Sequence, residues 1–197
     1  MEIERLAEST VKLVVKKSTI IYNPTDENNK KISSVSAVLL PSVTTDAHFD
    51  NAKLTIATPG EYEIEDISIQ GIPVAGSSGP LVLYRVSHDL ASVVCVPPVS
   101  PASLTNQVLE AVGLTDILVV SIEPYNGEFN PVDAAKIVRL LEPRAVIPVG
   151  YAKRTEALAK FLSEIGGVEQ QMDSFKVKDL PLPGEALQTL LLDVVGL

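Results

Sequence analysis

Three side chains able to bind a metal alternate within one short stretch of the chain. Asp46, His48 and Asp50 are separated by one residue each. In an extended backbone alternate side chains point to the same side, so the three could offer oxygen, nitrogen and oxygen atoms to one metal ion. A polar loop is the other interpretation, in which Asp50 helps to form a turn and Asp46 caps a short helix. The pattern leaves both open.

Other residues suited to chemistry are few, because the chain holds two histidines and one cysteine. His88 followed by Asp89 is typical of a turn between two strands. Cys95 lies in an apolar strand pattern with no basic neighbour to favour its thiolate, so we expect an inert core thiol. Ser77 and Ser78 match neither the Gly-x-Ser-x-Gly nor the P-loop pattern, which favours a flexible loop.

Composition narrows the classes of protein. The 197 residues carry 16 Lys and Arg against 25 Asp and Glu, a net charge of −9, which argues against nucleic acid as a partner. Hydrophobic residues make up 46% of the chain, enough for a sizeable core. No apolar run approaches the ~20 residues that span a bilayer, and the acidic start does not resemble a signal peptide. We therefore expect a cytoplasmic protein with no membrane contact.

Hydrophobic spacing predicts strands first and then alternating strands and helices. In the first half, β-branched and alternating patterns predict strands at 11–15, 19–22, 35–40, 81–86 and 92–96, and a hairpin that ends at Gly71. In the second half we expect helices after Ser103, after Asn130 and over 158–165, with strands at 117–121, 145–149 and 190–195. This order predicts an αββα sandwich or another mixed α/β fold, as one domain over residues 1–197.

Several segments in this order resemble the metallo-β-lactamase superfamily, most closely its ascorbate-phosphate lactonase-like branch of metal-dependent hydrolases. They are residues 58–64, 69–73, 104–109, 116–120 and 141–151. The resemblance runs almost end to end. It implies a compact, near-minimal αββα sandwich and, in relatives, metal-dependent hydrolysis.

The metal ligands of that family are missing at the matching positions. The family carries a His-x-His-x-Asp-His loop, later histidines and a bridging aspartate, whereas only one matching position here keeps its residue type. The remnant ligand positions are Ser42, Thr44, Asp46, Ala47, Gly76, Pro98 and Gly150. Glycine, alanine and proline side chains donate no electron pair to zinc. The resemblance thus implies the fold with its metal ligands lost, no cofactor and no catalytic residue.

An acidic loop after the strand at 117–121 could line what remains of the family's cleft. The candidate lining residues are Glu8, His48, Asp50, Ser77, Glu123, Tyr125 and Tyr151. A neutral or cationic ligand would suit such a lining better than a phosphate. An ordinary connecting loop is the other interpretation.

These observations favour a metal-free, non-catalytic binding or interaction module whose partner is an unknown protein or small molecule. One alternative is a hydrolase or lactonase with a zinc or manganese site rebuilt around Asp46, His48 and Asp50. Another is a structural subunit of a homo-oligomer.

Overall fold

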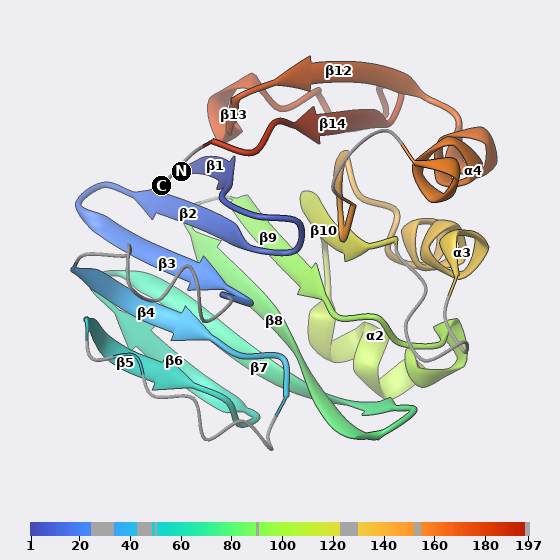
Figure 1. Ribbon diagram of the computed structural model, residues 1–197. Coiled ribbons are helices and arrows are strands. Elements are labelled where there is room, and N and C mark those ends of the chain that lie inside the picture. Colours follow the sequence, from blue (N-terminus) through green and yellow to red (C-terminus); the bar gives the residue numbers. More distant parts are fainter. Residues whose placement is uncertain are drawn as a thin grey trace.

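Two β-sheets pack face to face, and the helices lie against the outer face of one of them (Figure 1). The computed structural model describes residues 1–24, 34–42, 49, 51–89, 91–122, 130–151 and 155–195. The chain thus has the mixed α/β architecture of two sheets and few helices that its sequence predicts.

The first sheet consists mainly of N-terminal strands. They are β1 (Glu2–Arg5), β2 (Val11–Val15), β3 (Ser18–Tyr22), β4 (Val35–Leu39), β5 (Ala52–Ile56) and β13 (Ser174–Lys176). Their order in space is β13-β1-β2-β3-β4-β5, and β3, β4 and β5 run parallel. The carboxyl ends of β3 and β4 therefore meet at one edge of the sheet.

The second sheet contains eight strands. They are β6 (Gly60–Ile64), β7 (Ile67–Gly76), β8 (Gly79–His88), β9 (Ala91–Val96), β10 (Ile117–Ser121), β11 (Ala145–Val149), β12 (Val168–Met172) and β14 (Gln188–Leu192). Their order is β12-β14-β11-β10-β9-β8-β7-β6. Strands β9, β10 and β11 are parallel, which brings their carboxyl ends together at one edge.

The described helices pack on the outer face of the eight-stranded sheet (Figure 1). They are α2 (Asn106–Val112), α3 (Pro131–Leu141) and α4 (Glu156–Ile165), with short 3-10 turns η1 (Pro101–Ser103) and η2 (Val177–Asp179). Asn130 caps α3 as predicted, since its side chain accepts hydrogen bonds from the backbone N–H groups of Val132 and Asp133. None of the helices in the described part of the chain is long and apolar enough to cross a membrane.

One local prediction was wrong. Thr105, not Ser103, caps α2, because Ser100 and Pro101 first start a 3-10 turn that ends at Ser103. The hairpin of β6 and β7 ends at Gly71 as predicted, and β7 then continues to Gly76, where the chain turns directly into β8. Residues 77–78 therefore form a two-residue hairpin turn, and their flexibility stays a prediction.

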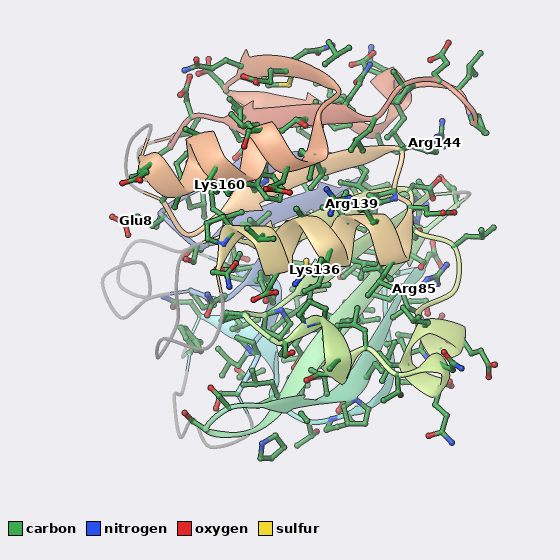
Figure 2. All side chains as sticks on the ribbon, turned by 90° about the vertical axis from the view of Figure 1, so that its right-hand side faces the viewer. Glu8, Arg85, Lys136, Arg139, Arg144 and Lys160 are labelled. Carbon is green, nitrogen blue, oxygen red and sulfur yellow. The ribbon has the colours of Figure 1, made fainter. Side chains whose placement is uncertain are left out.

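Figure 2 shows α3 and α4 side by side, with Lys136, Arg139 and Lys160 among their side chains. Each of these cations has a carboxylate partner: Lys136 pairs with Asp133 at 3.0 Å, and Arg139 and Lys160 pair with Glu164 at 3.6 and 2.9 Å. The basic residues of this helical face are thus engaged with acidic neighbours. That the protein does not bind nucleic acid stays a prediction.

Cys95 lies fully buried in the core between the two sheets. Burial raises the pKa of its thiol well above the ordinary value, so the reactive thiolate is not formed at neutral pH. We expect no reaction of the folded protein with a disulfide reagent such as DTNB, and one reacting thiol per chain after denaturation in guanidinium chloride. Reaction of the native protein at the rate of a free thiol would contradict this placement.

Candidate functional site

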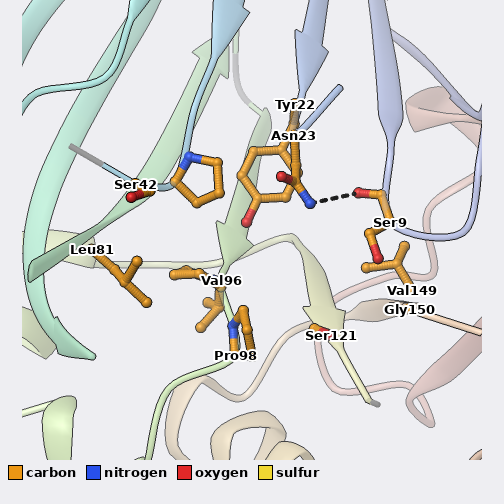
Figure 3. Close-up of a pocket in the computed structure, with 12 residues that line it drawn as sticks. Ser9, Tyr22, Asn23, Ser42, Leu81, Val96, Pro98, Ser121, Val149 and Gly150 are labelled. Atoms are coloured by element: carbon orange, nitrogen blue, oxygen red, sulfur yellow. Dashed lines mark hydrogen bonds between the residues drawn. The ribbon is translucent and has the colours of Figure 1, made fainter. Parts of the chain in front are cut away.

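A pocket of about 350 Å³ lies at the edge where strands of both sheets end (Figure 3). Its lining comes from the carboxyl ends of β3, β9, β10 and β11, the loops after β3, β4 and β9, the start of β8, and the β1–β2 turn. The lining residues are Ser9, Tyr22, Asn23, Pro41, Ser42, Leu81, Val96, Pro97, Pro98, Ser121, Val149 and Gly150. Because the ends of parallel strands share an edge, the topology itself gathers these residues.

Tyr84 of β8 connects the two sheets beside this pocket. Its hydroxyl lies 2.8 Å from the carbonyl oxygen of Leu40 and 2.9 Å from that of Ile56, and it donates to them. Both carbonyls belong to the ends of strands in the six-stranded sheet. The backbone N–H of Val82 also donates to the Pro41 carbonyl at 2.8 Å. These bonds fix the segment that leads into Ser42.

Asn23 is held in one conformation at the end of β3. It adopts the left-handed region with φ 50°, which asparagine tolerates better than most residues. Its N–H donates to the Leu39 carbonyl at 2.9 Å, and its carbonyl accepts the Thr10 hydroxyl at 2.8 Å. The Asn23 side-chain amide also donates to the Ser9 carbonyl at 3.4 Å (Figure 3). Asn23 and Ser9 are thereby held together in the pocket wall.

Arg5 is a buried cation behind the pocket, with 2% of its surface exposed. Its guanidinium donates to the backbone carbonyls of Ala7, Glu8, Leu192 and Tyr151, and it lies 4.0 Å from the centre of the Tyr151 ring. Burial lowers the pKa of Arg5, while nearby Tyr151 and Glu8 oppose that shift. Among the described residues, no carboxylate lies at ion-pair distance from Arg5. Backbone carbonyls and the Tyr151 ring compensate its charge instead.

The bonds of Arg5 position two parts of the pocket wall. The Glu8 carbonyl, one of its acceptors, also accepts the backbone N–H of Gly150 at 2.7 Å. Ser9 follows Glu8 directly, and Gly150 precedes Tyr151, whose carbonyl is another acceptor of Arg5. Arg5 thus links the Ser9 and Gly150 walls through their neighbours.

The Tyr22 side chain enters the pocket from the core. Its ring packs edge-on against Tyr84, with centroids 6.4 Å apart at 70°, and only 3% of the residue is exposed. Its hydroxyl makes no hydrogen bond to any residue that the structure describes, and Figure 3 shows it pointing toward Val96 and Pro98. Burial above all raises the pKa of Tyr22, so the phenol stays protonated.

The chemistry of the described lining does not fit the zinc ion that the resemblance would imply. Over its described part, the wall of the pocket holds no histidine, cysteine, aspartate or glutamate, the residue types that bind zinc. Within the described ranges, no group of three or more such residues lies close enough to hold a metal ion. The cluster expected at Asp46, His48 and Asp50 lies outside the described residues.

The structure brings together three of the predicted remnant ligand positions. Ser42, Pro98 and Gly150 all line the pocket, although they are far apart in the sequence. Gly76 is not part of the described lining, because it lies at the β7–β8 turn. A Cβ there would lie 2.7 Å from Leu81 Cδ1 and 2.8 Å from the Gly79 backbone oxygen, so this position has no room for a larger side chain unless the turn itself shifts.

The other predicted residues have different placements. Ser77 lies in the hairpin turn that follows Gly76. The Glu8 carbonyl accepts the backbone N–H of Gly150, and Glu8 itself is not part of the described lining. The Tyr151 ring packs on Arg5 and is not part of that lining either. The predictions that lie outside the described residues are Thr44, Asp46, Ala47, His48, Asp50, Glu123 and Tyr125.

Sequence reasoning missed the residues that shape this pocket most. Arg5 alternates with Ile3 and so shares the buried face of its strand, a signal available in the sequence. Tyr22 and Asn23 end an expected strand, which is where an α/β protein places its ligands.

Comparisons with known proteins agree with this architecture. A family model described as the beta-lactamase superfamily domain matches residues 2–150. None of the curated proteins compared with the chain matches it significantly.

Solved structures with the same fold are distant in sequence. A candidate Zn-dependent hydrolase of the metallo-beta-lactamase superfamily from Thermotoga maritima is 17% identical, with a TM-score of 0.73 over 98% of this chain and 99% of that one. The metallo-beta-lactamase fold protein YhfI from Bacillus subtilis is 8% identical, with a TM-score of 0.65 over 100% and 97% of the two chains. A candidate metal-dependent hydrolase from Parabacteroides distasonis is 13% identical, with a TM-score of 0.64 over 83% and 87%. At these identities the likeness shows the fold alone.

Proposed function

The chain belongs to the metallo-β-lactamase superfamily, and from that premise we propose that it is a metal-free, non-catalytic member that binds a small molecule in its pocket. It does so as a single domain over residues 1–197, derived from the ascorbate-phosphate lactonase-like branch. At three of the positions where the resemblance expects metal ligands, uncharged residues line the pocket.

One observation carries this proposal. Three positions at which the resemblance expects metal ligands lie together in one pocket, and they are occupied by Ser42, Pro98 and Gly150. A serine hydroxyl is a poor zinc ligand, and proline and glycine side chains are none. The pocket itself is retained, at a volume typical of small-molecule sites.

The fold makes this pocket a preformed site. Its walls are the ends of hydrogen-bonded strands, and Asn23 and the segment before Ser42 are fixed by backbone bonds. A ligand therefore does not have to order the described wall when it binds, which reduces the entropic cost of binding.

Metal analysis of the purified protein tests the proposal. We expect less than stoichiometric zinc, iron and manganese, and a melting temperature that a chelator such as EDTA leaves unchanged, because no metal contributes to folding stability. Stoichiometric metal, together with a lower melting temperature after chelation, would overturn it.

The hydrolase alternative is favoured by the candidate hydrolases among the similar structures and by the acidic and imidazole side chains of Asp46, His48 and Asp50. Under that alternative, the protein loaded with zinc or manganese would cleave a lactone or a phosphodiester, and His48→Ala would abolish both turnover and metal binding. Under the proposal, His48→Ala changes neither metal content nor melting temperature, since this side chain holds no metal.

A further inference from the structure

We propose that the Tyr22 hydroxyl is the group that recognises the ligand, and that the ligand is a small uncharged molecule with a carbonyl or similar neutral acceptor oxygen. This inference rests on the proposed function, because it names the ligand class of the same pocket.

Two neighbouring tyrosines provide the first argument. Tyr84 and Tyr22 pack edge to face, and both are almost fully buried. The Tyr84 hydroxyl is satisfied by the carbonyls of Leu40 and Ile56. The Tyr22 hydroxyl, by contrast, has no partner among the described residues and opens on the pocket. Hydroxyls of buried residues are nearly always hydrogen-bonded to protein or water, so one that faces a cavity without a protein partner is available to a water molecule or to a ligand atom that replaces it.

The protonation of Tyr22 decides which atom it meets. Because burial raises its pKa well above the ordinary value, the phenol keeps its proton at neutral pH. A protonated phenol donates a hydrogen bond through its O–H group, so its partner has to be an acceptor. A carbonyl oxygen is the simplest acceptor that carries no charge.

The uncharged lining provides the second argument. The polar side chains of the described wall are neutral, namely Ser9, Tyr22, Asn23, Ser42 and Ser121. Moving a charged ligand out of water without an opposite charge is far more costly than burying a neutral one. The described wall therefore offers no opposite charge to a carboxylate, a phosphate or an ammonium group.

The remaining wall sets the shape of the ligand. Leu81, Val96 and three prolines add apolar surface to the lining, and Figure 3 shows Leu81, Val96 and Pro98 among these residues. An apolar body against this surface and a single acceptor oxygen near Tyr22 would satisfy the described wall. A volume of about 350 Å³ limits the ligand to a small molecule.

A matched series of probes tests this inference. Benzamide is neutral and has a carbonyl oxygen, benzoate is an anion, benzylamine is a cation at neutral pH, and toluene has no acceptor. Each is titrated into isotopically labelled protein, and binding is followed at the backbone amides of the lining residues. The variant is Tyr22→Phe, which removes only the hydroxyl. The control is Tyr62→Phe, whose hydroxyl bonds to Thr58 away from the pocket.

We expect benzamide to bind in the pocket at least tenfold more tightly than benzoate or benzylamine. Tyr22→Phe should weaken benzamide about five- to tenfold, as expected for one hydrogen bond, and leave toluene unchanged. Tyr62→Phe should change neither. If Tyr22→Phe leaves the affinity for benzamide unchanged, or if a charged probe binds more tightly than benzamide, the inference is overturned but the pocket remains a binding site. If no probe perturbs the lining residues, the proposed function and the inference both fall.

Discussion

Replacing Arg5 by methionine should destabilise the protein by about 3–5 kcal/mol, because several buried carbonyls lose the guanidinium that donates to them. The carbonyls of Tyr151, Leu192 and Ala7 all accept from its guanidinium, and 2% of the residue is exposed to water. Since small domains are stable by only about 5–15 kcal/mol, this is a large share of the total. Urea unfolding followed by circular dichroism measures the change.

Two companion variants separate the effect of the planar guanidinium group of Arg5 on stability from the effect of its charge. Arg5→Lys keeps the charge but has no planar fork to reach several carbonyls at once, so we expect roughly half of the loss. Arg139→Met removes an arginine from the surface of α3, where its partner is Glu164, and should change the stability by less than about 0.5 kcal/mol. If Arg5→Met unfolds at the same urea concentration as Arg139→Met, the structural role assigned to Arg5 is wrong.

Arg5 also illustrates a limit of reasoning from sequence. Its strand reads Glu-Ile-Glu-Arg, and the charged residues suggest an exposed N-terminal segment. Alternation nevertheless places Arg5 on the face of Ile3, which is fully buried. The carbonyls that compensate the charge come from residues 151 and 192, far along the chain. Such long-range partners have no local signature in the sequence.

Elements with local signals were predictable, whereas polar edge strands were not. The start of α3 follows from Asn130, Pro131 and Asp133, which act within one turn of the helix. Strand β12 reads Val-Glu-Gln-Gln-Met and lies at the edge of its sheet, mostly exposed. It needs no alternating hydrophobic pattern, because its pairing with β14 along its whole length holds it in place.

The candidate site was predictable only where the resemblance supplied positions. Ser42, Pro98 and Gly150 were placed by comparison with ligand-bearing loops, and the structure gathers them in one pocket. Tyr22 is the last residue of β3 and Asn23 follows it, and the resemblance expects no metal-binding residue in this region. Their contribution depends on how the two sheets face each other, which the order of elements does not specify.

The two packed tyrosines should respond to loss of their hydroxyls in different ways. Tyr84→Phe leaves the Leu40 carbonyl without this donor inside the protein, so we expect a loss of about 1–3 kcal/mol. Tyr22→Phe removes a hydroxyl that bonds to no described residue, and its effect should stay within about 0.5 kcal/mol of zero. Thermal unfolding by calorimetry and urea unfolding both measure the difference.

This pair has an internal control, because both substitutions remove one oxygen from rings in edge-to-face contact and leave both rings in place. A general effect of making the core less polar would change the stability of both variants in the same direction. A loss confined to Tyr84→Phe instead identifies its bond to the end of β4 as a link between the sheets beside the pocket. If Tyr22→Phe is as damaging as Tyr84→Phe, the Tyr22 hydroxyl has a structural partner and is not reserved for a ligand.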